Sequence, residues 1–197
     1  MLEEKNGRLT QIRASGMSDL LIVVVQQFQH YCSEAIQLKL KHQTDLTPET
    51  IGKECPENKS RVIISQTFTA MVVEAFYFDY KHGKESKSQA TKWSKQSPVA
   101  QFVQLSDRYL FVKNSENTDL YNKLTDLNKL RKRLVHNEST SLGNYRKDLN
   151  YLTPIDCLDL LIELFAYFYK HDRECHTAKF TFDILSEVRN KANEPLN

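Results

Sequence analysis

The residues that reverse a polypeptide chain are scarce in this sequence, and their scarcity limits the folds open to it. Its 197 residues include only 5 glycines and 5 prolines, whereas average usage would give about 14 and 10. A sandwich or barrel of short strands needs a turn every few residues, and most turns use glycine or proline. We therefore predict an all-α protein, an antiparallel bundle of four to five main helices with few connections.

Helix-start signals and apolar spacing locate these helices. Ser18 can cap the first one. An i, i+4 series then favours helix over strand, namely Phe28, Cys32, Ile36 and Leu40. Pro98 and Pro154 stand where proline is favoured, at the first position of a helix. The predicted helices cover residues 18–41, 59–81, 98–109, 119–136, 154–173 and 181–191.

The segments between the predicted helices are expected to be loops, and nothing divides the chain into parts. Residues 42–58 form a long loop, 84–97 an exposed Lys/Ser/Gln-rich loop, and 137–152 a polar loop. No repeat or linker interrupts the sequence, so we predict a single domain over 1–197. Its core is expected at about 18–173, with 1–16 and 174–197 peripheral.

Charge, cysteines and hydropathy indicate where such a protein works. Lys and Arg number 27 against 25 Asp and Glu, so any basic surface must be local. The four cysteines contain no CxxC pair, which is typical of reduced, intracellular thiols. The longest uninterrupted apolar stretch, 20–25, is far too short to span a bilayer, and the first ten residues lack a signal-peptide pattern. We expect a cytoplasmic protein with no membrane association.

Glu74 is the one charged residue between Arg61 and Asp79 on the predicted helix 59–81. Such a helix is apolar nearly all round, which is typical of burial between layers or in a subunit interface. At 100° per residue, its apolar positions Ile64 and Phe68 lie on one face and Glu74 lies about 80° to one side. A carboxylate there needs a partner or a hydrated cleft.

Arg131 occupies a core position of the predicted helix 119–136. With Leu120 at zero, Leu124 and Leu127 lie at about +40° and −20°, and Arg131 lies at about +20°, inside the apolar arc. A guanidinium on the inward face needs a carboxylate, backbone oxygens or an anionic ligand. His136 lies about 140° from Arg131 on a regular helix, so the two converge only if the helix ends or bends near Val135, or if a second subunit completes the site.

The string from Arg131 to His136, Arg-x4-His in a helical protein, resembles the motif of the HEPN superfamily (higher eukaryotes and prokaryotes nucleotide-binding domains). Members are helical bundles that carry Arg-x4–6-His near a helix end, often with an acidic residue on an earlier helix, as Glu74 is here. Many members have Asn, Asp or His directly after the arginine, where this chain has Lys132. The resemblance spans about 20–173.

The resemblance implies a metal-independent endoribonuclease that needs no cofactor, built as a homodimer with a composite cleft. His136 would be the general base or acid, Arg131 would stabilise the charge on the phosphorus, and Glu74 would orient Arg131. Basic residues near the motif, interleaved with tyrosines, suit a single-stranded RNA track. The candidate RNA-binding residues are Lys129, Lys132, Arg133, Asn137 and Arg146.

Other interpretations stay open at this point. Arg131 and Glu74 can form a purely structural ion pair, with His136 at a helix terminus. The chain can then be a catalytically inactive helical module that binds RNA or a partner protein, or a scaffold. As an active nuclease it would be a toxin or a defence or stress effector, with an antitoxin or regulatory protein as a possible partner.

Two further groups of residues are weaker candidates. A second basic cluster with Trp93 suits either an RNA track or an ordinary solvated face, and it comprises Lys81, Lys84, Lys87, Lys92 and Lys95. Four potential metal ligands are His171, Asp172, Cys175 and His176. A helix end near Arg173 would scatter these ligands, so we predict no metal site.

Overall fold

The chain folds into an all-α bundle in this computed structural model, which describes residues 2–5, 8–11, 16–42, 47–136 and 152–193. The four helices that lie side by side are α1 (Met17–His42), α3 (Asn58–Lys84), α8 (Pro154–His171) and α9 (His176–Asn193). The others are α2 (Pro48–Glu54), α4 (Lys87–Trp93), α5 (Pro98–Arg108), the 3₁₀ turn η1 (Ser115–Asn117) and α6 (Asp119–His136). A small antiparallel hairpin, β1 (Leu2–Lys5) and β2 (Arg8–Gln11), precedes the bundle.

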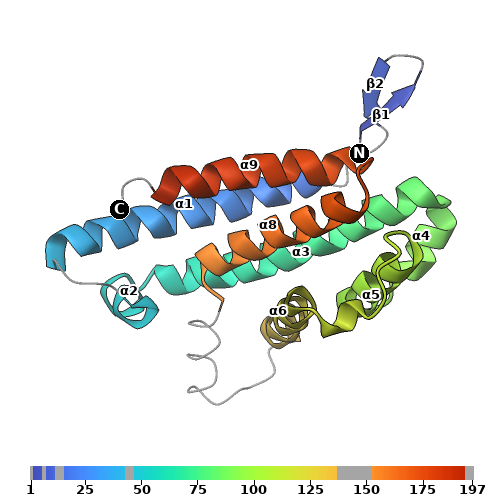
Figure 1. Cartoon of the computed structure of the whole chain (residues 1–197). Coiled ribbons are helices and arrows are strands. Elements are labelled where there is room, and N and C mark those ends of the chain that lie inside the picture. The colour runs from blue at the N-terminus through green and yellow to red at the C-terminus, as the bar shows by residue number, and fades with distance from the viewer. Residues whose placement is uncertain (1, 6–7, 12–15, 43–46, 137–151, 194–197) are drawn as a thin grey trace.

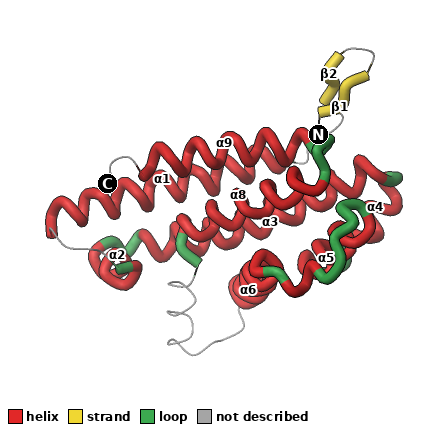
Figure 2. The backbone as a smooth tube through the Cα atoms, in the orientation of Figure 1, coloured by secondary structure: helices red, strands yellow, loops and turns green. Residues whose placement is uncertain are grey.

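α1, α3, α8 and α9 lie along one another, with α8 in the middle (Figure 1). α8 contacts α1, α3, α6 and α9. α1 runs opposite to α3, and α8 runs opposite to α9, whereas α3 and α8 run in the same direction. α4, α5 and α6 cover the side of α3 away from α9, and Figure 2 shows helix along nearly the whole described chain beyond the hairpin. Among the described residues, no helix is long and apolar enough to cross a membrane.

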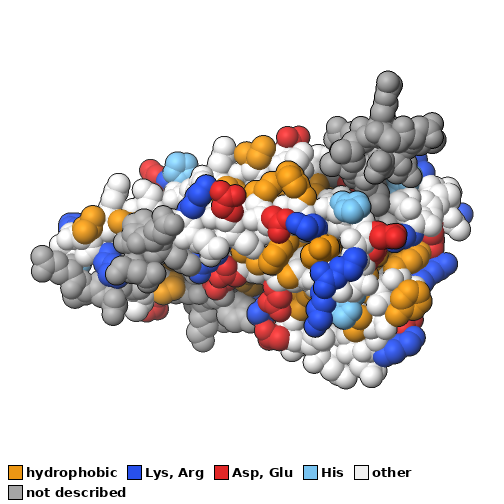
Figure 3. All heavy atoms as spheres, turned by 45° about the horizontal axis from the view of Figure 1, so that its top comes forward, with side chains coloured by type: hydrophobic (Ala, Val, Ile, Leu, Met, Phe, Trp, Pro, Cys, Tyr) orange, Lys and Arg blue, Asp and Glu red, His pale blue; other side chains and the backbone are white. Residues whose placement is uncertain are grey.

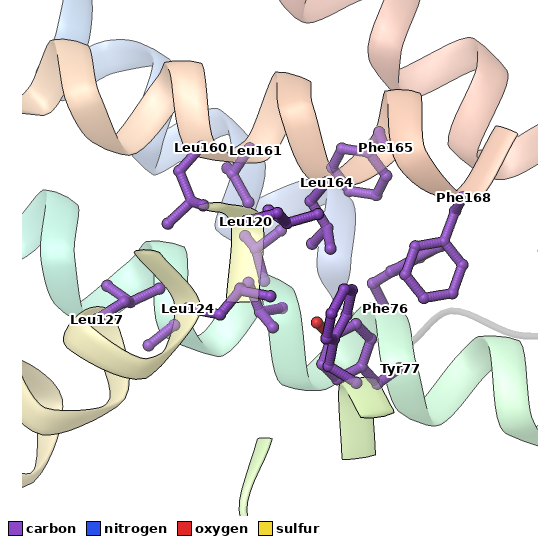
Figure 4. Close-up of a cluster of buried hydrophobic side chains, with 14 of the residues drawn as sticks. Phe76, Tyr77, Leu120, Leu124, Leu127, Leu160, Leu161, Leu164, Phe165 and Phe168 are labelled. Atoms are coloured by element: carbon purple, nitrogen blue, oxygen red, sulfur yellow. The ribbon is translucent and has the colours of Figure 1, made fainter. Parts of the chain in front are cut away.

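The core lies where α3, α6 and α8 meet (Figure 4). Phe76 of α3 is almost fully buried and makes edge-to-face contacts with Phe165 and Phe168 of α8, with ring centroids 4.9 and 4.8 Å apart. Leu120, Leu124 and Leu127 of α6 close the same cluster. The apolar composition of α8 is therefore explained by its contacts with four other helices of the same chain.

The predicted helix starts at Pro98 and Pro154 are confirmed, and local chemistry explains them. The Ser97 hydroxyl accepts a hydrogen bond from the backbone N–H of Ala100 at 3.3 Å. Thr153 and Asp156 form a capping box, in which each side chain bonds the other residue's backbone N–H. Each pair satisfies N–H groups that the first turn of a helix leaves free.

Two segments predicted as loops contain short helices, so those two predictions were wrong. α2 lies within 42–58, where Thr47 caps it and Pro48 takes its first position. α4 lies within 84–97 and begins with a capping box of Ser86 and Gln89. Trp93, 8% exposed, holds α4 against the bundle, and its indole N–H donates to Gln104 Oε1 at 2.7 Å. Packing against the bundle stabilises helices too short to form alone.

The last helix is longer than predicted and belongs to the core. α9 spans His176–Asn193 rather than 181–191, and Ala178 and Leu185 are buried in the main cluster. The expectation that 174–197 is peripheral is therefore wrong for the described part of this segment. α9 packs on α8 and lies beside α1. In this position α9 covers the face of α8 that is opposite to α3.

Cys32, Cys55, Cys157 and Cys175 are all free thiols, and three of them are buried. Burial raises the pKa of Cys32 and Cys175 to about 11 and that of Cys157 to about 12. Because the thiolate is the reactive form, these three should react slowly with Ellman's reagent in the native protein. We expect only Cys55 to react quickly at pH 8, and all four after unfolding. More than one fast thiol in the native protein would contradict this burial pattern.

Candidate functional site

Glu74 and Arg131 meet where α3 packs against α6. The Arg131 guanidinium donates from Nη1 to Glu74 Oε1 in a direct ion pair. The two side chains are 32% and 31% exposed, so the pair lies at the edge of the core with access to solvent. A carboxylate partner for Arg131 was one of the outcomes expected from its position on the helix.

Arg131 is less buried than its position around the helix predicts. Leu124, Leu127 and Leu130 are at most 4% exposed, whereas Arg131 and Leu134, which lie within the same arc, are only half-buried. On this face of α6, burial therefore decreases toward the end of the helix. Arg131 therefore reaches both Glu74 and water.

The second candidate residue, His136, is the final residue of α6, and its side chain lies outside what the structure describes. The helix extends through Val135 and ends at His136. Positions 131 and 136 therefore lie about 140° apart around the axis. Within one chain, the two positions therefore lie on different sides of α6.

The predicted RNA-binding residues differ in exposure. Lys132 is exposed, and Arg133 is half-buried. Lys129 is exposed and pairs with Asp126 at 3.1 Å on the same helix. Asn137 and Arg146 lie outside the described residues. On the face seen in Figure 3, basic and acidic side chains are intermixed, in keeping with a local rather than an extended basic area.

Burial raises the pKa of Glu74, and the nearby positive charge of Arg131 partly opposes the increase. A carboxyl group with a higher pKa in the folded chain binds its proton more tightly there than in the unfolded chain. Its contribution to stability is therefore present at low pH and lost as the pH rises through the raised pKa.

Glu74→Gln should remove this dependence. Between pH 4.5 and neutrality, we expect the free energy of unfolding of the variant to fall less than that of the wild type. Urea unfolding at several pH values measures the difference, with the exposed Glu57→Gln as the control. Identical pH profiles for wild type and Glu74→Gln would contradict the assignment.

The second basic cluster is partly a buried structural feature that the sequence interpretation missed. Lys81 is only 4% exposed, and its ammonium pairs with Glu85 at 2.8 Å and donates to the Tyr109 hydroxyl at 2.9 Å. It also lies 5.4 Å from the centre of the buried Trp93 ring. Tyr109 donates to Glu85 as well. Lys81 and Trp93 are therefore unavailable to RNA. The i, i+4 spacing of Lys81 and Glu85 is the sequence feature that could have indicated their ion pair.

The four potential metal ligands do not form a site. In the part of the chain that the structure describes, no three His, Cys, Asp or Glu side chains are placed to hold a metal ion together. Asp172 instead accepts hydrogen bonds from the Tyr80 hydroxyl at 2.7 Å and pairs with Lys84 at 3.0 Å. Cys175 is buried. Asp172 therefore links the ends of α3 and α8.

Comparison with known proteins adds no family to this description. No protein-family model, curated protein or solved structure matches the chain significantly.

Proposed function

We propose that the protein is a HEPN-like, metal-independent endoribonuclease whose catalytic groups are Arg131 and His136. The observation that carries this proposal is the position of Arg131: a guanidinium fixed by Glu74, one-third exposed, and five residues before a histidine at the end of the same helix. Exposed Lys129 and Lys132 lie on the same last turns. Fixed and accessible cations of this kind suit phosphate recognition.

The chemistry follows from these groups. The His136 imidazole removes the proton from a ribose 2′-hydroxyl, whose oxygen then attacks the adjacent 3′-phosphate. Arg131 stabilises the negative charge that builds up on the phosphorane oxygens. The bond from phosphorus to the 5′-oxygen breaks, and this oxygen takes a proton as it leaves. The products are a 2′,3′-cyclic phosphate and a 5′-hydroxyl end.

The active form in this proposal is a homodimer in which Arg131 of one copy faces His136 of the other. The outer face of α3 supports a second copy, because it carries a half-buried apolar stripe beside Glu74. The stripe comprises Ile64, Phe68, Met71, Ala75 and Phe78, and Met71 is 37% exposed. A monomer by light scattering at working concentration would reject the composite site.

The alternative is an inactive module that binds RNA or a partner protein, and one observation favours it. Glu74 already engages the Arg131 guanidinium, so a phosphate must compete with that carboxylate. If the enzyme is active, we propose that it acts in the cytoplasm as a toxin or a defence or stress effector, held in check by an antitoxin or regulatory protein.

Incubation of the pure protein with single-stranded and structured RNA in EDTA tests the proposed activity. We expect cleavage that persists without metal and leaves 2′,3′-cyclic phosphate ends. Replacing the ribose at the cleaved bond by 2′-deoxyribose should abolish cleavage there, because the nucleophile is gone. Absence of cleavage, or cleavage of the 2′-deoxy substrate, would reject the mechanism.

A further inference from the structure

Phe111 combines two unusual properties at the end of α5. Its φ is +57°, in the left-handed region that bulky residues rarely adopt, and its side chain is 82% exposed. No other large hydrophobic side chain among the described residues is more exposed. A strained backbone and an uncovered phenyl ring thus coincide at one residue.

The helix end explains the backbone conformation but not the choice of phenylalanine. The backbone N–H of Val112 bonds to the carbonyl of Ser106 at 2.9 Å, and Val112 packs against the core. The left-handed residue just before Val112 lets the chain turn back toward the helix, and glycine adopts this conformation most readily. Phenylalanine is less favourable there, and its exposed ring adds little burial. The ring therefore contributes little to the stability of the chain itself.

The surroundings of Phe111 indicate what the ring contacts. Arg108 and Lys113 flank it in sequence, and their side chains are 66% and 76% exposed. Their partners are Glu85, at 3.0 Å from Arg108, and the half-exposed Asp107, which pairs with Lys113. Ion pairs made by exposed cations such as these contribute little stability, which leaves Arg108 and Lys113 accessible to a second anion. An exposed aromatic ring with an exposed cation three residues before it and another two residues after it in the sequence suits a single-stranded nucleic acid, whose bases alternate with phosphates.

We propose that Phe111 is a stacking contact for a base of single-stranded RNA, with Arg108 and Lys113 beside the adjoining phosphates. The choice of RNA as the ligand rests on the proposed function. Phe111 itself lies apart from Arg131. Arg131 belongs to the last turns of α6, whereas Phe111 precedes the start of that helix by eight residues. The RNA would thus be held at a second point away from the cleaved bond.

Binding of a fluorescent 2′-O-methyl oligoadenylate of about twelve nucleotides tests the contact, because such a strand stacks but lacks the free 2′-hydroxyl needed for cleavage. We expect Phe111→Gly to bind it about 5-fold or more weakly, and Phe111→Tyr to bind it as the wild type does. The midpoint of thermal unfolding of Phe111→Gly should not fall, because glycine suits the left-handed conformation. Phe180→Ala is the matched control, since Phe180 is an exposed phenylalanine (65%) on α9.

Unchanged binding in Phe111→Gly, equal loss in Phe180→Ala, or no binding by the wild type would overturn the contact. Cleavage of unmodified RNA is measured separately on the same proteins. A wild type that binds through Phe111 but does not cleave would uphold the contact and reject the nuclease. RNA cleavage by the wild type, together with unchanged oligoadenylate binding in Phe111→Gly, would uphold the nuclease and reject the contact.

Discussion

Replacing Glu85 by alanine is expected to lower the free energy of unfolding by about 3 kcal/mol, the order found when one partner of a buried ion pair is removed. The Glu85 carboxylate accepts hydrogen bonds from the Lys81 ammonium and the Tyr109 hydroxyl. The Lys81 side chain is only 5% exposed, so alanine at position 85 leaves its charge buried without its carboxylate. For a chain of this length, the midpoint of thermal unfolding should fall by about 6 °C or more.

Arg108→Ala provides the matched control for this result. Arg108 pairs with the same Glu85 carboxylate at 3.0 Å, but its side chain is 66% exposed. An exposed pair contributes little, so we expect a loss below about 1 kcal/mol. Calorimetry or urea unfolding compares the two variants. Equal losses would show that burial of Lys81 does not determine the effect.

Arg131→Ala and His136→Ala are each expected to lower the rate of RNA cleavage about 100-fold or more. In the proposed mechanism, the first substitution removes the cation that stabilises the phosphorane, and the second removes the group that transfers the proton. The readout is the initial rate of cleavage in EDTA, with circular dichroism showing that each variant folds. Arg189→Ala is the control, because Arg189 is a similarly half-buried arginine that pairs with Asp159 at 2.8 Å.

Two results would contradict these roles. Cleavage at the wild-type rate by folded Arg131→Ala and His136→Ala proteins would place the active site elsewhere. Loss of folding in Arg131→Ala, combined with no cleavage by the wild type, would leave the Glu74 pair as a structural feature alone.

The long helices could be predicted because their signals are local. Thr153, Pro154 and Asp156 lie within four residues and together define the start of α8. The short helices α2 and α4 carry start signals of the same kind, Thr47–Pro48 and the Ser86–Gln89 capping box, but helices of seven residues are not stable on such signals alone. α4 depends on burial of Trp93 against α5, which is a contact of tertiary structure that no local pattern reports.

Side-chain burial was predicted less well than the helices that carry it. The i, i+4 series on α1 begins at the buried Phe28 and ends at Leu40, which is 75% exposed. Each step of four residues turns the helix about 40° past a full circle, so three steps rotate the series off the core. Leu38 is buried in its place. The burial of Arg131 was predicted poorly for a related reason. Periodicity gives the side of α6 on which a residue lies, but not how well each turn along the helix is covered.

The most direct test of the proposed site mixes two inactive variants. Arg131→Ala and His136→Ala proteins are unfolded together and refolded as an equal mixture, so that about half of the dimers contain one chain of each kind. If Arg131 and His136 act across the dimer, each mixed dimer keeps one intact site, and about a quarter of the wild-type cleavage rate should return. Activity no higher than that of the two variants measured separately would contradict the composite site.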